Sequence, residues 1–185
     1  PLGPIIGIFF PPFKSQNMSN NSFVTHDNKE IARAQAVQAH ACGIEPDARF
    51  SPILLKPTDE KSSQVVLRGE AIDQYSIHDY IKFKKQAFEI VKEDYYSLLE
   101  EYDVVIIEGA GSPAEINLKQ HDIVNMNIAK LCDTPVALVG DIYLGGVYAS
   151  FIGHYHLFEP WEKELLKGFI VNRFKGDESL LESAH

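Results

Sequence analysis

The residue best placed for chemistry is Glu108, an acid that stands at the end of an apolar run. It follows Val104–Ile107 and is itself followed by Gly109-Ala110-Gly111. Glycine lets a backbone approach a ligand closely, and a carboxylate at such a point suits a Mg²⁺ ion that carries phosphates. A solvated acid ahead of an ordinary turn is the alternative that this segment alone leaves open.

A second acid, Asp141, repeats the arrangement. It follows the apolar run Val136–Val139 and precedes Gly145-Gly146. Two strands that end in carboxylates beside glycine loops indicate a divalent-metal or phosphate site at one edge of a sheet. The alternative is that Asp141 caps the helix expected after Gly146, although the gap between them is long for a cap.

A polar segment with many amide and hydroxyl groups follows the first apolar run of the chain. It spans Phe13–Ser22, and its Lys14 can meet a phosphate or a substrate carboxylate as a point charge. Asparagine and serine also favour turns, so a plain polar loop is the alternative.

Three further polar residues stand at the ends of expected elements. Asp27 and Glu30 have the spacing of a capping box at the start of an Ala-rich helical segment. The alternative is that either acid holds a metal near the strand ends. Asn172 closes the last apolar run, where its amide can donate and accept towards a purine edge.

Apolar runs and helical patterns alternate along the chain, which indicates an α/β fold. The runs predict strands at Ile5–Phe10, Gln64–Leu67, Val104–Ile107, Val136–Val139 and Gly168–Val171. The helical patterns cover Glu30–Cys42, His78–Glu101, Asp122–Leu131 and Val147–Phe158. We therefore expect a doubly wound, mostly parallel sheet with helices on both faces, in a single domain over residues 1–185. Ligands of such sheets bind outside the carboxyl ends of the strands, where the polar residues above stand.

Composition narrows the class of protein. The 185 residues include 17 Lys+Arg and 26 Asp+Glu, a formal net charge of -9, and no basic cluster, which argues against nucleic-acid binding. The longest apolar runs have the length of strands, so no membrane span is expected. Cys42 and Cys132 lie far apart in the sequence, which excludes a disulfide scaffold and indicates the cytoplasm. No signal peptide is recognisable at the start of the sequence.

The polar motifs together resemble the synthetase domain of the cobyric acid synthase family. They run in family order from Phe13 to about Leu181, and Glu108–Asn117 is the most specific of them. The other matching segments are Phe13–Met18, Asn21–Thr25, Glu30–Ala39, Pro52–Pro57, Gln64–Leu67, Tyr102–Asn117, Asp122–Met126, Val139–Asp141 and Lys167–Asn172.

The resemblance implies a P-loop NTPase fold like that of dethiobiotin synthetase, and an ATP-dependent carbon–nitrogen ligase that uses ATP and Mg²⁺. Members of this family amidate peripheral carboxylates of a corrinoid, adenosylcobyrinic acid a,c-diamide, to give cobyric acid in cobalamin biosynthesis. ATP first converts a carboxylate, which is a poor acyl donor, into an acyl phosphate. Ammonia then displaces the phosphate, and Mg²⁺ offsets the charge that builds up during phosphoryl transfer.

The resemblance also assigns roles to single residues. Lys14 and Glu108 are expected to be catalytic, and the amide-rich segment with Gln16, Asn17 and Asn21 is expected to face the corrinoid side chains. The residues expected at the metal and the nucleotide are Glu108, Glu30 or in its place Asp27, Gly109, Gly111 and Asn172, the last of which would read the adenine.

Three features depart from the family pattern. No Gly-x-x-x-x-Gly-Lys-Ser/Thr occurs, so the first strand, phosphate loop and helix of the fold are expected to be missing, in a fragment or in a natural P-loop-less protein. No glutaminase segment is recognisable, so ammonia is expected from a domain or subunit outside this chain. Tyr143 and Leu144 stand where the family has an acid and an arginine.

Two other functions stay open at this level. A non-catalytic relic would bind a corrinoid or a partner subunit without turning over ATP. A different ligase of the same fold, such as a dethiobiotin synthetase, fits less well with the Gln16–Met18 and Glu108–Pro113 segments. The oligomeric state is not indicated by the sequence, and a homodimer is one option.

Overall fold

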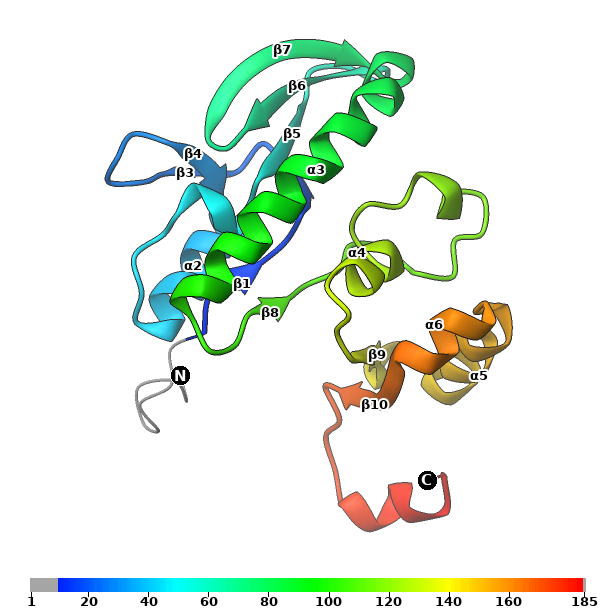
Figure 1. The fold of residues 1–185 in the computed structure, drawn as a ribbon. Coiled ribbons are helices and arrows are strands. Elements are labelled where there is room, and N and C mark those ends of the chain that lie inside the picture. Colours follow the sequence, from blue (N-terminus) through cyan, green and yellow to red (C-terminus); the bar gives the residue numbers. More distant parts are fainter. Residues whose placement is uncertain (1–9, 185) are drawn as a thin grey trace. The chain divides into compact units, whose positions relative to one another are not determined.

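The computed structural model describes residues 10–184, which form two compact units. The first unit contains residues 10–111 and 121–128, and the second contains residues 112–120 and 129–184. Figure 1 labels their helices and strands. The strand expected at Ile5–Phe10 lies outside the described residues except for Phe10, and the expectation of a single domain stays a prediction.

A four-stranded sheet in the order β2-β5-β6-β7 dominates the first unit. Its strands are β2 (Gln16–Met18), β5 (Ile53–Pro57), β6 (Ser62–Leu67) and β7 (Glu70–Ser76). β2 and β5 are parallel, whereas β5, β6 and β7 pair antiparallel. Arg68 and Gly69 join β6 to β7 with φ angles of 46° and 78°, the signature of a tight hairpin turn. This sheet is therefore not mostly parallel, because such short connections allow only antiparallel neighbours.

The remaining pairings are short. In the first unit, β1 (Pro12–Phe13) is parallel to β8 (Ile106–Ile107), and β3 (Ser22–Val24) forms an antiparallel hairpin with β4 (Glu30–Ala32). In the second unit, β9 (Val136–Asp141) is parallel to β10 (Leu166–Asn172). The α/β class is thus confirmed, with both parallel and antiparallel pairings.

The helices of residues 10–184 are α2 (Arg33–Cys42), α3 (Ile77–Glu101), α4 (Met126–Leu131), α5 (Val147–Leu157) and α6 (Pro160–Leu165), with 3₁₀ turns at Ala48–Phe50, Lys119–His121, Ile142–Leu144 and Glu178–Ala184. Four of these helices follow the expected segments, of which α5 starts at the expected residue and the others start elsewhere, whereas α6 was not expected. No helix among the described residues is long and apolar enough to cross a bilayer.

The helix expected from Glu30 begins three residues later, at Arg33. Glu30–Ala32 instead forms β4, which pairs with β3, so the capping box of Asp27 and Glu30 was a wrong prediction. Asp27 lies in the turn between the two strands, and the N-cap of α2 is Ala32, which offers no side-chain cap. The Ala-rich sequence and the acid spacing favour a helix here, but pairing with β3 buries Ile31 completely in the core, so this segment forms a strand.

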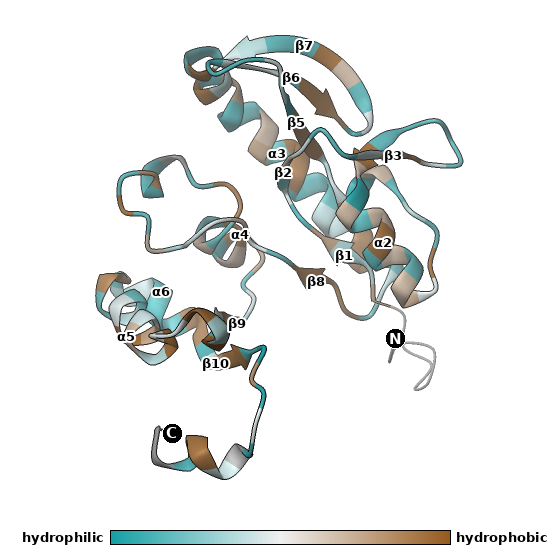
Figure 2. Ribbon diagram, turned by 180° about the vertical axis from the view of Figure 1, so that it is seen from behind, coloured by the Kyte–Doolittle hydropathy of each residue, from teal (hydrophilic) through white to brown (hydrophobic). Residues whose placement is uncertain are grey.

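α3 runs alongside the four-stranded sheet in Figures 1 and 2. Its N-cap is Ser76, whose hydroxyl accepts a hydrogen bond from the Asp79 amide at 3.2 Å. Its buried residues recur at helical spacing, which gives the mixed hydropathy colours of this helix in Figure 2. They include Tyr80, Ala87, Val91, Tyr95 and Leu98.

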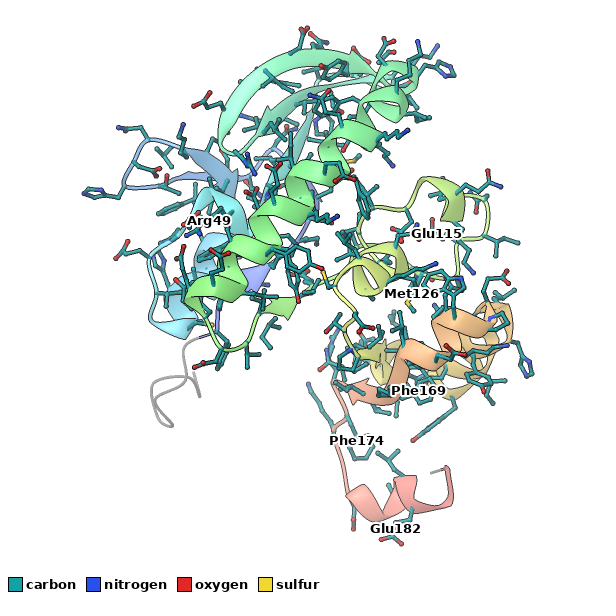
Figure 3. The ribbon with its side chains drawn as sticks, in the orientation of Figure 1. Arg49, Glu115, Met126, Phe169, Phe174 and Glu182 are labelled. Atoms are coloured by element: carbon teal, nitrogen blue, oxygen red, sulfur yellow. The ribbon has the colours of Figure 1, made fainter. Side chains whose placement is uncertain are left out.

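Each unit has its own apolar core. In the first unit Phe13, Phe50 and Leu98 are completely buried, and the Phe13 ring meets Tyr95 edge-on at 5.7 Å. In the second unit Leu138, Val147 and Phe151 form the buried core. The half-exposed Phe169 of β10, labelled in Figure 3, adds a ring contact with Phe151 at 4.9 Å. The anchoring of Phe13 fixes the end of β1, from which Lys14 projects.

Candidate active site

Lys14 and Glu108 meet at the ends of two parallel strands. β1 and β8 pair in a register that sets Phe13 opposite Ile107, so the next residue of each strand faces the other. The Glu108 amide donates to the Phe13 carbonyl at 2.8 Å, and Nζ of Lys14 lies 3.1 Å from Oε1 of Glu108. The side chain of Lys14 is 15% exposed and that of Glu108 is 43% exposed. The structure therefore brings together the two residues expected to be catalytic.

Two glutamines of α2 hold the other oxygen of the same carboxylate. The side-chain amide of Gln38 donates to Oε2 of Glu108 at 2.9 Å, and that of Gln35 donates to it at 3.2 Å. Gln35 also donates to Oε1 of Gln38 at 3.1 Å. Residues three apart share a helix face, so the spacing could have revealed this pair, which sequence reasoning missed.

Asn17 extends this polar network inward. Its side chain is buried, and its amide donates to Oε1 of Gln35 at 2.9 Å and to the Ser51 hydroxyl at 3.0 Å. Gln35 is completely buried. A continuous run of hydrogen bonds thus connects Asn17 through Gln35 to Glu108. Because buried polar groups are costly to leave unpaired, this network fixes the position of the carboxylate.

A hollow of about 470 Å³ opens beside this network. It is lined by Asn17, Ser19, Asn21, Ala32, Arg33, Ala34, Val37 and Gln38. Two of the three residues expected to face a substrate, Asn17 and Asn21, are among them. Gln16 is not, and its Oε1 instead accepts a hydrogen bond from the Tyr80 hydroxyl at 2.5 Å. Burial raises the pKa of Tyr80, which keeps this hydroxyl protonated as a donor.

The glycine loop after Glu108 is anchored by Asn125. The Ala110 amide donates to Oδ1 of Asn125 at 3.0 Å, and Nδ2 of Asn125 donates to the Ala110 carbonyl at 2.8 Å. A Cβ at Gly109 would lie 2.3 Å from that Oδ1, and Gly111 has a φ of 63°. The close contact at Gly109 and the positive φ of Gly111 therefore explain why glycine stands at both positions, without any ligand. Asn125 was not identified from the sequence.

The other acids expected at a metal are engaged elsewhere. Glu30 pairs with Lys56 at 2.6 Å, and Asp27 accepts a hydrogen bond from the Thr25 hydroxyl at 2.5 Å. That hydroxyl holds the pKa of Asp27 below its ordinary value. Among residues 10–184 no three Asp, Glu, His or Cys side chains are grouped closely enough to hold a metal ion.

Glu108 is also paired, but its side chain is 43% exposed against 24% for Glu30, so a Mg²⁺ ion could reach its carboxylate more easily. This ion usually binds one or two protein carboxylates and fills its other positions with phosphates and water. A single acid beside an ammonium group fits an ion that arrives with a nucleotide. It does not fit a resident metal held by protein ligands alone.

Asp141 and Asn172 close neighbouring parallel strands of the second unit. β9 and β10 pair in a register that sets these two residues opposite each other. The Asp141 carboxylate accepts from the Tyr143 amide at 2.9 Å and pairs with Arg173 at 3.0 Å. It therefore caps the 3₁₀ turn Ile142–Leu144, where sequence reasoning had weighed a cap for the later helix. Oδ1 of Asn172 accepts from the Arg173 amide at 2.9 Å.

The chain is similar over nearly its whole length to curated cobyric acid synthases. It is 52% identical to the cobyric acid synthase of Clostridium acetobutylicum over 171 residues, an aligned region that makes up 92% of this chain and 35% of the relative. It is 52% identical over 176 residues to that of Caldanaerobacter subterraneus, covering 95% and 35%, and 51% identical over 175 residues to that of Nocardia farcinica, covering 95% and 34%.

These identities confirm the resemblance drawn from the motifs. The chain spans about a third of the length of the curated relatives that it matches. No family model and no solved structure matches it.

Proposed function

We propose that this chain, a homologue of one segment of the cobyric acid synthases, carries part of the site of an ATP-dependent carbon–nitrogen ligase. Its substrate would be a corrinoid whose peripheral carboxylates are amidated in cobalamin biosynthesis. The observation that supports this most is the Lys14–Glu108 pair, held at two strand ends by the α2 glutamines. A P-loop fold like that of dethiobiotin synthetase is part of the same proposal.

The reaction brings negatively charged phosphate and carboxylate groups together, and Glu108 with a bound metal and Lys14 can stabilise that arrangement. ATP with Mg²⁺ supplies the phosphoryl group that turns a substrate carboxylate into an acyl phosphate, from which ammonia displaces phosphate. Glu108 would hold the metal. Lys14 would offset negative charge on the phosphoryl group and the substrate carboxylate as the two approach each other, which is unfavourable without a cation.

The hollow would bind side arms of the corrinoid. The side chains of Asn17, Ser19 and Asn21 offer donors and acceptors that suit amide and carboxylate arms. Gln38 both lines the hollow and donates to Glu108, so an arm bound in the hollow would lie next to the Lys14–Glu108 pair.

Other parts of the reaction need groups beyond Lys14, Glu108 and the hollow. Phosphates of ATP would be cradled by a glycine-rich loop supplied from outside this chain. Ammonia would come from a glutaminase domain or subunit. Asn172 at the end of β10 would contact the adenine.

The test uses the protein encoded by the full reading frame that contains this sequence. We expect Glu108→Gln and Lys14→Met each to lower corrinoid-dependent ADP release and amide formation by about 100-fold or more. Lys82→Gln, which changes a side chain that is 80% exposed, is the matched control and should leave both rates unchanged. Amide formation by Glu108→Gln at a rate within about twofold of the unsubstituted protein would contradict the proposal.

A further inference from the structure

Among the described ion pairs, Arg33 is the arginine of residues 10–184 that has no acidic partner. Arg49 pairs with Asp47 and Glu101, Arg68 pairs with Asp94 and Glu93, and Arg173 pairs with Asp141. No described carboxylate lies within ion-pair distance of Arg33, although the chain carries 26 acids. This exposed guanidinium is one of the residues that line the hollow.

The other walls of the hollow match an anion with a short hydrocarbon stem. None of the lining residues is acidic, and Ser19 and Asn21 add neutral polar groups. Ala32, Ala34 and Val37 give the hollow an apolar side. A guanidinium binds a carboxylate through two parallel hydrogen bonds, and the apolar wall would cover the adjoining methylene groups. Inorganic phosphate would leave that wall uncovered.

The site is held in place by backbone hydrogen bonds. The Arg33 amide donates to the Asn21 carbonyl at 3.2 Å, and the Ser19 amide donates to the Leu55 carbonyl at 2.9 Å. The Asn21 amide in turn donates to the Ser19 hydroxyl at 3.0 Å. The loop and the first turn of α2 are therefore connected before any ligand binds, which lowers the entropic cost of binding.

We infer that Arg33 is the residue that makes the hollow specific for a free carboxylate arm, with Ser19 and Asn21 contacting an amide beside it. This inference rests on the proposed function, because it names which group of the substrate the hollow selects. Arg33 lines the hollow, whereas Lys14 and Glu108 do not, so we expect substitution of Arg33 to change substrate binding more than phosphoryl transfer.

The direct test titrates the chain with three small probes and follows backbone and arginine side-chain NMR signals. The probes are succinamate, which has one carboxylate and one amide, succinamide, which has two amides, and inorganic phosphate. We expect succinamate to shift the signals of Ser19, Asn21 and Arg33 and to bind about tenfold more tightly than succinamide, a difference of about 1.4 kcal/mol. Tighter binding of phosphate than of succinamate at these residues would overturn the inference.

Variants make the test specific. Arg33→Gln should bring the affinity for succinamate down to that for succinamide, and Arg33→Lys should keep part of the preference because it keeps the charge but loses the paired donors. Lys82→Gln removes the same charge from a side chain outside the hollow and should keep the full preference. A preference that survives in Arg33→Gln would show that another group selects the carboxylate.

A second measurement separates this inference from the proposed function. In the protein of the full reading frame, Arg33→Gln should raise KM for the corrinoid about tenfold with kcat nearly unchanged, whereas Glu108→Gln should lower kcat. Full activity of Glu108→Gln would defeat the proposed function. Loss of activity in Glu108→Gln together with an unchanged KM in Arg33→Gln would defeat the Arg33 inference alone.

Discussion

Lys14 and Glu108 are 94 positions apart in the sequence, yet Nζ of Lys14 lies 3.1 Å from Oε1 of Glu108. Parallel pairing of β1 and β8 produces this contact, because it aligns the residues that follow the two strands. The carboxylate also accepts from Gln35 and Gln38, so both of its oxygens have donors. The pair is thus positioned by the sheet and oriented by a helix, which is how rigid elements support a site.

The first prediction concerns the coupling between these two residues. Lys14→Met should lower the free energy of unfolding by about 1 kcal/mol, a modest value because Glu108 remains accessible to water. When Lys14→Met is made in the Glu108→Gln background, it should lower the free energy of unfolding by less, because Lys14 has no charged partner there. Urea unfolding of the two single variants and the double variant gives the coupling energy. Strictly additive effects would show that the ion pair does not contribute to stability.

The second prediction concerns Gly109 and Asn125. Gly109→Ala should destabilise the protein by roughly 1–3 kcal/mol, because the new Cβ would lie 2.3 Å from Oδ1 of Asn125. Asn125→Ala should also destabilise it, since the Ala110 amide and carbonyl lose their partners. In the double variant the clash is absent, so its loss should be clearly smaller than the sum of the two single losses. Thermal or urea unfolding measures all three, and a loss equal to the sum would contradict the packing explanation.

The sequence indicated the apolar elements more reliably than the polar ones. The runs Val136–Val139 and Gly168–Val171 became β9 and β10, and His78–Glu101 became α3 within one residue at its start. The edge strand β7 was not expected, because its residues are almost all exposed and carry no apolar run. β4 was mistaken for the start of a helix, since its pairing with β3 cannot be seen in local spacing.

The candidate site was predictable only in part, for a related reason. Strand ends and residue types indicated Lys14 and Glu108, and the motif resemblance indicated Asn17 and Asn21. The three-residue spacing of Gln35 and Gln38 indicates that they share a helix face, but it does not indicate their contact with Glu108, which depends on how α2 packs. Long-range packing of this kind is not encoded in any short segment.

The third prediction concerns the buried acid Asp94 of α3. Its side chain is only 4% exposed, and Arg68 reaches it from the turn between β6 and β7. Arg68→Met should lower the free energy of unfolding by about 3–5 kcal/mol, because it leaves a buried charge without its partner. Lys82→Met, at a side chain that is 80% exposed, is the control and should change it by less than about 0.5 kcal/mol.

This loss should depend on pH in a definite direction. Burial raises the pKa of Asp94 above its ordinary value of 3.8, and the opposing effect of Arg68 disappears in Arg68→Met. The folded state then binds a proton more readily than the unfolded state, so stability falls as pH rises from about 3.8 through the raised pKa. Unfolding experiments should therefore show a smaller deficit of Arg68→Met in acid than at neutral pH. A deficit that is constant over this range would contradict the assignment.

The fourth prediction concerns Glu30 of β4 and Lys56 of β5, whose charged groups lie 2.6 Å apart. Burial opposes ionisation of Glu30, but hydrogen bonds from Lys56 and Ser22 outweigh it and hold the pKa of Glu30 below its ordinary value of 4.5. The stabilisation from this pair is therefore complete above pH 4.5 and is lost as pH falls through the lowered pKa. Lys56→Met should lower the free energy of unfolding by about 1 kcal/mol at pH 7 and by progressively less below pH 4.5, because protonated Glu30 no longer needs the cation.

Lys61→Met, at an exposed position of the same unit, serves as the control. Urea unfolding of the three proteins at pH 7 and pH 3 provides the comparison, and a cost of Lys56→Met that is equal at both pH values would show that packing of the lysine stem, and not its charge, stabilises this contact.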